Sequence, residues 1–574
     1  MPGLTQQLEE RLAPAFAAVA GTDVDPVIRR SRHTDFQADG ALGLARRLRE
    51  NPRAIAERIV ERADLDDLCS EVAVSGPGFI NLTLSAGALG RMLAAISHDE
   101  RLGVPVTDHP ETVVIDYSAP NAAKEMHVGH LRSTIIGDAA VRLLEWVGHT
   151  VVRENHIGDW GTPFGMLIEH LLDIGEAEAA HKLSVGDLNG FYRAARRKFE
   201  ADQVFQERSR QRVVLLQRGD PATLRLWHTL VEESQAYFLA VYDRLGVRLT
   251  ADDFVGESVY NDQLQAIVDE LDKLDLLRVN DAARCVFPGG FHNRNGEPLP
   301  LIVQKRDGGF GYAATDLATI RERIYDQGAT RLLYVVGLPQ RQHLEMVFAT
   351  ARDAGWLTPP ARAEHVGHGA ILGSDGKILR TRAGASIKLI DLLDEAVARA
   401  ADVVAAKNPD MDDATRATVA EATGVGAVKY ADLSTDRVKD YVFDYDRMLA
   451  FEGNTAPYLQ YANARIRSIF RKLGRPASTD VAEVVVAAPE ERALAIELLS
   501  LPGVIDEVVE TMEFHRLATY LYGLATAFTG FYENCAVLRS EGRVRDSRLV
   551  LCDLTARTLA LGLGLLGITA PEQM

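Results

Sequence analysis

The feature that most constrains this chain is a strand-to-helix junction between residues 112 and 147. An apolar strand is expected from Thr112 to Ile115, and a polar loop broken by Pro120 follows it. A helix is expected next, because apolar residues recur at helical spacing at Ile136, Ala140, Leu143, Leu144 and Val147 before Gly148. The first turn of such a helix offers unpaired N–H groups and the positive end of the helix dipole. The junction is therefore a natural seat for a phosphate group.

Two histidines open this helix. His127 and His130 are three positions apart with Gly129 between them, so both imidazoles are expected on one side of the first turn. Gly129 has no side chain and lets a nucleotide approach the backbone closely. Taken alone, such a run is equally consistent with two ordinary polar residues at a helix start.

A second polar cluster lies roughly 250 residues downstream, in the loop 373–384. It combines several glycines and Asp375 with three cations, Lys377, Arg380 and Arg382. Flexible backbone with positive charge is typical of a loop that binds phosphate. On its own, however, the pattern more often indicates an exposed basic hairpin turn.

Bulk composition narrows the class of protein. A chain of 574 residues with 47% hydrophobic and 25% charged residues suggests a soluble protein of about three or four domains. Acidic residues precede the apolar part of the N-terminus, so no signal peptide is expected, and the most apolar tract, 558–568, is too short to span a bilayer. The four cysteines are scattered without a CxxC pair, which favours a reducing cytoplasm over a disulfide framework or a zinc site.

The net charge of −18 disfavours non-specific binding of nucleic acid. Local basic clusters nevertheless occur at 193–198, 208–225 and 465–475. Exposed charges more than about 10 Å apart are screened at ordinary salt, so a local RNA site remains compatible with an acidic total.

The pattern along the chain predicts four parts. Residues 1–107 are expected to form a small α+β domain, with an opening helical stripe interrupted by Pro14. Residues 108–390 alternate strands and helices, which is typical of a Rossmann-like doubly wound parallel sheet, with a helical insertion at about 166–295. The expected strands of this sheet are Val113–Tyr117, Thr150–Asn155, Leu301–Gln304 and Leu332–Val336. Residues 391–454 form a helical stem or junction, and 455–574 an all-α bundle.

The junction resembles the HIGH signature of class I aminoacyl-tRNA synthetases. With the run Ser118 to Asn121 before it and Leu131 to Thr134 after it, the stretch is similar to that of arginyl-tRNA synthetases, and the resemblance extends over nearly the whole chain. The loop 373–384 resembles the KMSKS loop of the same class, with Thr381 in place of the second lysine. Lys124 is placed to supply the missing charge.

The resemblance implies an arginine–tRNA ligase. Such an enzyme uses ATP to convert L-arginine to arginyl-adenylate, and then transfers the arginyl group to the 3′-terminal ribose of tRNA-Arg, releasing AMP and pyrophosphate. Mg²⁺ is expected with ATP rather than in a protein cage, and no zinc or membrane is expected. The resemblance also implies a helical anticodon-binding domain at 455–574, a tRNA-contacting N-terminal domain and a cytoplasmic monomer.

Residue roles follow from the same resemblance. The catalytic residues it implies are Lys124, His127, His130, Lys377, Arg380 and Arg382, with Gly129 joining His127, His130 and Lys377 in ATP binding. Arginine is expected to contact Ser118, Asn121, Tyr312, Asp316 and Gln340. Binding of tRNA is expected at Gln37, Tyr461, Arg465 and Arg467. Tyr312 and Asp316 are spaced i, i+4, so both can reach one point if a helix begins there, and carboxylates are what a guanidinium requires.

Three alternatives remain open. A non-catalytic tRNA-binding paralogue would be expected to lose the histidines or the loop cations. A HIGH-type nucleotidyltransferase would be a shorter chain without the long helical C-terminus. Another class I synthetase would share the fold, although the cysteinyl enzyme would need paired zinc-binding cysteines.

Overall fold

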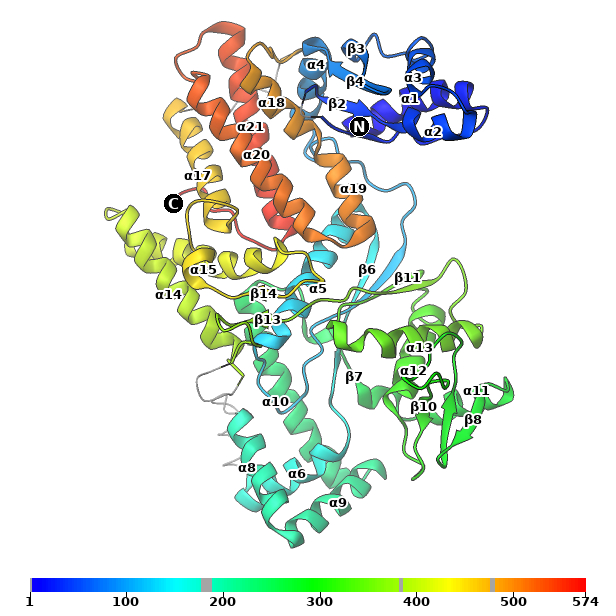
Figure 1. The fold of residues 1–574 in the computed structure, drawn as a ribbon. Helices are drawn as coiled ribbons and strands as arrows, with labels where there is room; N and C mark the ends of the chain where they lie inside the picture. Colours follow the sequence, from blue (N-terminus) through cyan, green and yellow to red (C-terminus); the bar gives the residue numbers. More distant parts are fainter. Residues whose placement is uncertain (1–2, 32, 177–187, 381–385, 475–480) are drawn as a thin grey trace. The chain divides into compact units, whose positions relative to one another are not determined.

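A computed structural model describes residues 3–31, 33–176, 188–380, 386–474 and 481–574 (Figure 1). The chain forms two compact units. The first contains Met1–Val106, Arg399–Ser434 and Asp446–Met574, and the second contains Thr107–Ala398 and Thr435–Tyr445.

The second unit is built on a parallel sheet of five strands in the order β12-β11-β5-β6-β7. The strands are β5 (Thr112–Asp116), β6 (Thr150–Ile157), β7 (Phe254–Gly256), β11 (Arg331–Tyr334) and β12 (Arg362–His365). The crossover helices include α5 (Val128–Val147), α12 (Tyr312–Tyr325) and α13 (Arg341–Asp353). This is the predicted doubly wound architecture, in which a ligand site is expected at the carboxyl ends of the strands.

Two details of the predicted sheet are wrong. The segment Leu301–Gln304 is a strand, β10, but it pairs antiparallel with β9 (Ala283–Val286) in a separate three-stranded sheet that also contains β8 (Leu277–Asn280). The strands β7 and β12, which were not predicted, complete the parallel sheet. They have three and four residues, too few for an apolar pattern to stand out.

The segment 166–295, predicted as a helical insertion, is mostly helical but also contains short strands. Its helical part comprises α6 (Thr162–Ile174), α8 (Leu188–Ala201), α9 (Gln203–Gln217) and α10 (Pro221–Leu245). The chain then returns to the parallel sheet as β7, before α11 (Leu264–Lys273) and the small antiparallel sheet.

A buried ion network joins α12 to the centre of the parallel sheet. Arg323, of which 1% is exposed, donates hydrogen bonds to Glu154 at 2.7 Å and to Asp116 at 2.8 Å. Both carboxylates lie on central strands, and removing one member of such a set would leave an uncompensated buried charge. The network therefore anchors the last turn of α12 to β5 and β6.

The N-terminal part of the first unit is an α+β domain, as predicted. Its antiparallel sheet has the order β1-β2-β4-β3, with β1 (Ile28–Arg30), β2 (Phe36–Ala38), β3 (Cys69–Ser75) and β4 (Phe79–Leu84). The helices are α1 (Leu4–Ala20), α2 (Gly40–Leu48), α3 (Pro52–Val60) and α4 (Ala86–Ser97). The predicted interruption at Pro14 is wrong, because α1 continues through it. Apolar residues on both sides of Pro14, Leu12 and Phe16, are fully buried, so tertiary packing overrides the lost backbone hydrogen bond.

The rest of the first unit is helical. It contains α15 (Asp413–Leu433), α16 (Tyr445–Met448), α17 (Ala456–Leu473), α18 (Pro489–Leu499), α19 (Leu501–Thr511), α20 (Phe514–Asn534) and α21 (Gly542–Leu565), together with the end of α14 (Leu389–Lys407). The C-terminal tail packs on α17, where Gln460 donates to the Thr569 carbonyl at 2.7 Å and Asn463 to the Pro571 carbonyl at 3.2 Å.

The predicted division into four parts differs from these units. The N-terminal domain joins the helical part through contacts such as the Asp35–Arg492 ion pair and an Arg557 hydrogen bond of 2.9 Å to the Ser97 carbonyl. The predicted junction 391–454 is split, because residues 435–445 belong to the second unit. There β14 (Tyr441–Val442) pairs with β13 (Ile371–Leu372).

The four cysteines, Cys69, Cys285, Cys535 and Cys552, are all buried and unpaired. Among the helices that the structure describes, none has both the length and the apolar character needed to cross a bilayer.

Candidate functional site

The side chains predicted to bind substrates gather where the parallel strands end. Asn121 follows β5, Gln340 follows β11, and Tyr312 opens α12. The carboxyl ends of β5, β6, β7 and β11 lie on the same edge of the sheet because all of these strands are parallel. The topology therefore assembles the candidate site from segments that are far apart in the sequence.

The histidine turn has a defined hydrogen-bond pattern. His127 is the N-cap of α5, and its Nδ1 accepts a hydrogen bond from the Gly129 N–H at 3.0 Å. The Nδ1 of His130 accepts from the His127 N–H at 3.0 Å, and the two ring centroids are 4.1 Å apart. A Cβ on Gly129 would lie 2.7 Å from the His127 ring, so any other residue here would displace that ring. Since both Nδ1 atoms accept, we assign the proton of each neutral ring to Nε2.

Electrostatics keep these two rings neutral. Burial lowers the pKa of His130 to about 3, and burial together with Lys124 lowers the pKa of His127 below its ordinary value. Neutral imidazoles with Nε2–H groups donate hydrogen bonds without adding a full positive charge. The turn can thus bind phosphate oxygens through two fixed donors.

The second motif forms a hairpin. The Gly373 N–H donates to the Lys377 carbonyl at 2.8 Å, the Leu379 N–H to the Ile371 carbonyl at 3.0 Å, and Asp375 accepts from the Lys377 N–H at 3.1 Å. The side chains of Lys377 and Arg380 are exposed, and Arg382 lies outside the described residues. The local geometry is thus that of a basic hairpin turn.

The chain downstream of this hairpin pairs with the histidine turn. The Val128 N–H donates to the Ile387 carbonyl at 3.0 Å, and the Leu389 N–H donates to the Met126 carbonyl at 3.0 Å. His127 and Lys388 form an antiparallel bridge. The histidine turn is therefore paired with residues 387–389, a segment that follows the hairpin in the chain.

The N-terminal end of α12 carries two of the residues predicted to bind arginine. Tyr312 is 76% exposed, so its ring is available to a ligand. The Oδ2 of Asp316 lies 2.6 Å from the Nε2 of His343, and this contact raises the pKa of His343. Gln340 ends the short 3-10 helix η3 (Leu338–Gln340) and is exposed.

Glu257 is a candidate site residue that the sequence did not reveal. It opens the 3-10 helix η2 (Glu257–Tyr260) directly after β7, and burial, together with the nearby carboxylates of Asp159 and Asp316, raises its pKa to about 7. Within the described part of the chain, Glu257 forms no ion pair with a lysine or arginine. Asp159 fixes the turn by accepting from the Ser258 N–H at 2.9 Å and its hydroxyl at 2.7 Å. Glu257, Asp159 and Asp316 are therefore neighbouring carboxylates, and their mutual repulsion would favour a bound cation.

Ser118 has a different position from the one expected for a substrate contact. Its hydroxyl is buried, 2.8 Å from the Tyr242 hydroxyl, and accepts a hydrogen bond from Thr134 at 2.9 Å. The Ser118 hydroxyl therefore has two hydrogen-bond partners inside the protein. Asn121 is exposed and forms a parallel bridge with Gly158, at the end of β6, so it remains available to a substrate.

The positions predicted to bind tRNA lie in the first unit. Tyr461 is 44% exposed on α17, with its ring centroid 6.3 Å from that of Phe451. Arg465 is exposed and lies over the Tyr532 ring at 4.5 Å, while Arg467 is half-buried. Gln37 donates to Asp39 at 2.6 Å.

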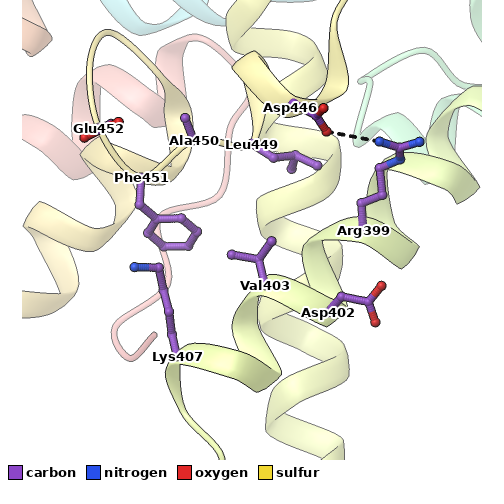
Figure 2. A pocket seen from close by; sticks show the side chains of 9 residues that line it. All are labelled: Arg399, Asp402, Val403, Lys407, Asp446, Leu449, Ala450, Phe451 and Glu452. Carbon is purple, nitrogen blue, oxygen red and sulfur yellow. Dashed lines mark hydrogen bonds and ion pairs between the residues drawn. The ribbon is translucent and has the colours of Figure 1, made fainter.

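A pocket of 620 Å³ lies in the helical part of the first unit (Figure 2). Arg399 pairs with Asp446 at 3.2 Å on one side of it, and the Lys407 amine lies 4.7 Å from the centre of the Phe451 ring on the other. None of the predicted site residues lines this pocket. We therefore do not assign it to the chemistry.

Most of the predicted basic cluster at 208–225 is compensated locally. Arg208 pairs with Asp173 at 2.6 Å, Arg212 with Glu169 at 2.7 Å, and Arg225 with Glu176 at 2.8 Å. Sequence inspection overstated the positive charge of this region because its partners come from α6 and the residues just after it. Among the described residues, no group of histidine, cysteine and carboxylate side chains could hold a metal ion.

Comparisons with known proteins agree along the whole chain. The family model described as "tRNA synthetases class I (R), catalytic domain" matches residues 91–445. The "Arginyl tRNA synthetase N terminal domain" matches 3–84, and the "DALR anticodon binding domain" matches 459–574. The chain is 55% identical to an arginine–tRNA ligase of Thermobifida fusca, over 99% of both chains. It is 49% identical to that of Frankia casuarinae, over 100% of this chain and 99% of the relative.

Solved structures show the same similarity. An arginyl-tRNA synthetase from Plasmodium falciparum superimposes with a TM-score of 0.87 at 29% identity, and one from Thermus thermophilus with a TM-score of 0.81 at 26% identity. In both cases all of each chain is covered.

Proposed function

The chain belongs to the arginyl-tRNA synthetases, and because it is therefore an ATP-dependent arginine–tRNA ligase, we propose which of its residues carry out the reaction. The observation that carries the proposal is the pairing of residues 126–128 with 387–389, which joins the histidine turn to the chain that follows the cationic hairpin.

In the first step, a carboxylate oxygen of L-arginine attacks the α-phosphorus of ATP, and the bond to pyrophosphate breaks. Negative charge builds up on the phosphates, so the protein accelerates the step by holding donors and cations around them. We assign the Nε2–H groups of His127 and His130 to the phosphate oxygens. Gly129 leaves room for the nucleotide.

The cations Lys124, Lys377, Arg380 and Arg382 are proposed to neutralise the leaving pyrophosphate. Mg²⁺ is proposed to enter with ATP, held by phosphate oxygens, and would add positive charge there. No zinc is proposed. A monomer is the proposed working unit.

In the second step, the 3′-terminal ribose hydroxyl of tRNA-Arg attacks the carbonyl carbon of arginyl-adenylate, and AMP leaves. Tyr461, Arg465, Arg467 and Gln37 are the proposed tRNA contacts, on the basis of their place in the two tRNA-related domains. Tyr461 and Arg465 are also exposed. The cytoplasm, where tRNA is charged, is the proposed compartment, and four unpaired thiols are compatible with it.

Arginine is proposed to bind with its guanidinium between Asp316 and Glu257. Tyr312 offers an aromatic face, and Gln340 and Asn121 offer amides for the remaining polar groups. Ser118 is assigned a positioning role through its bonds to Tyr242 and Thr134. Binding would supply the cation that the carboxylate group lacks.

This assignment predicts a pH dependence of arginine binding. The pKa of Glu257 is raised to about 7 in the arginine-free protein, and only the ionised carboxylate pairs with a guanidinium. Below pH 7, binding must release a proton, so the KM for arginine should fall as pH rises from 6 to 7 and level off above that. One proton corresponds to at most about tenfold per pH unit. Pyrophosphate exchange at each pH measures the effect.

The Glu257→Gln variant is the control for that dependence. Glutamine keeps the shape but cannot ionise, so the variant should bind arginine weakly at every pH and lose most of the slope. His343 contributes a smaller slope of the same sign, because its protonated ring pairs with Asp316 and competes with the guanidinium. A wild-type slope in Glu257→Gln would contradict the assignment.

Charging of total tRNA with each of the twenty labelled amino acids tests the function as a whole. Only arginine should be attached, and attachment should require ATP. A non-catalytic paralogue would attach none, although the retained histidines and cations argue against that alternative. Pyrophosphate exchange with and without tRNA would show whether activation needs tRNA.

A further inference from the structure

We propose that helix α8 of the insertion positions Lys124 and the histidine turn for arginine activation, through Asn189 and Tyr192, with Glu125 and Lys388 completing the connection. This inference rests on the role proposed above for Lys124. It adds four positioning residues, none of which the sequence had suggested.

The first contact holds Lys124 itself. Its amine lies over the Tyr192 ring, 4.6 Å from the ring centre. A cation held against an aromatic face loses much of the freedom of its long side chain, so the charge is kept close to the histidine turn. The interaction depends on the ring and does not need the tyrosine hydroxyl.

The second contact holds the neighbouring residue. Asn189 donates its side-chain amide to a Glu125 carboxylate oxygen at 2.8 Å, and its amide oxygen accepts from the Glu125 N–H at 3.3 Å. Asn189 and Tyr192 are three positions apart, so they lie on one face of α8. One helix face therefore fixes two consecutive residues of the loop that leads into His127.

The third contact joins this loop to the chain beyond the cationic hairpin. The Lys388 amine lies 3.0 and 3.1 Å from the two Glu125 carboxylate oxygens. Only 1% of the Glu125 side chain is exposed, against 40% for Lys388. A buried carboxylate is tolerated when it is paired and hydrogen-bonded, and both partners of Glu125 come from segments distant in the sequence.

These contacts link α8 to the residues proposed to act in arginine activation. Lys388 lies in the segment 387–389, which pairs with residues 126–128. Glu125 directly precedes residues 126–128. A shift of α8 would therefore move Lys124, the histidine turn and the base of the second motif together. None of these contacts reaches Asp316 or Glu257, so the arginine pocket should be unaffected.

The test compares variants in pyrophosphate exchange with tRNA present, with kcat and KM measured separately. Tyr192→Leu and Asn189→Ala should each lower kcat by about tenfold and leave the KM for arginine within about twofold, because a misplacement of about 1 Å at a reacting centre costs rate. Tyr192→Phe keeps the ring and should restore wild-type kcat. Lys388→Met should lower kcat, and Lys388→Arg should restore most of it.

Arg196→Ala is the matched control on α8. Arg196 is exposed and pairs with Glu200 on the same helix at 2.6 Å, so its removal should leave kcat unchanged. The inference would be overturned if Tyr192→Leu and Asn189→Ala both kept wild-type kcat while Lys124→Ala was inactive. The proposed function would still hold in that case. An active Lys124→Ala would instead overturn the role of Lys124 itself. A parallel rise in the KM for arginine, or an equal loss in Tyr192→Phe, would also overturn the inference.

Discussion

Replacing His130 with alanine should lower the rate of arginine activation by about 10²- to 10³-fold, which is typical for loss of one fixed donor to developing negative charge. The substitution removes an Nε2–H group and also leaves the His127 N–H without its acceptor. Both histidines of the turn are thus affected at once. Single-turnover formation of arginyl-adenylate measures the chemical step directly.

Two amide variants separate these effects. Asparagine at position 130 can place its oxygen near the position of Nδ1 and keep the backbone contact, but it has no donor where Nε2 was. Glutamine reaches further and can place an N–H group near the Nε2 position. We therefore expect His130→Asn to be as slow as the alanine variant and His130→Gln to recover part of the rate. Near-normal activation by His130→Ala would remove this residue from the catalytic set.

Replacing Asp316 with asparagine should weaken arginine binding by about 10²- to 10³-fold, since removing one partner of a desolvated charge pair costs roughly 2–5 kcal/mol. The guanidinium would keep Glu257 but lose its second carboxylate, and His343 would lose the partner that raises its pKa. The KM for ATP should change by no more than a few-fold. Equilibrium binding of labelled arginine measures the arginine affinity, and pyrophosphate exchange kinetics measure the KM for ATP.

Asp326→Asn provides the comparison. Asp326 is an exposed carboxylate at the C-cap of α12, the same helix that carries Asp316 in its second turn. Its replacement removes one negative charge far from the strand ends and should leave arginine affinity unchanged. Equal affinity in Asp316→Asn and wild type would refute the proposed pocket.

Local sequence patterns predicted much of the fold reliably. The strand-to-helix junction, the parallel architecture and the helical C-terminus depend on periodicity over ten or more residues, and the structure has all three. The short strands β7 and β12 were not predicted, because three or four residues are too few to show a periodic pattern. The segment Leu301–Gln304 was recognised as a strand but assigned to the wrong sheet, since an apolar run does not specify its partner.

In the candidate site, too, local contacts could be predicted from the sequence and long-range contacts could not. Sequence spacing brought together His127 with His130 and Tyr312 with Asp316, because each pair lies on one turn of helix. The position of Glu257 near Asp159 depends on the pairing of β7 with β6, which lies about 100 residues earlier in the chain. No local sequence pattern predicts this pairing. Ser118 shows the converse case, in which a motif residue that looked available is used for internal hydrogen bonds.

The buried cysteines give the protein an intrinsic set of unfolding reporters. Burial and nearby carboxylates raise the pKa of Cys69 to about 11, and burial raises those of the other three. Thiolate, the form that alkylating reagents attack, is therefore scarce while the chain is folded. The N-terminal sheet, the small antiparallel sheet and the C-terminal helices each contain at least one such thiol. Brief alkylation followed by mass spectrometry would thus follow the opening of each region without any engineered label.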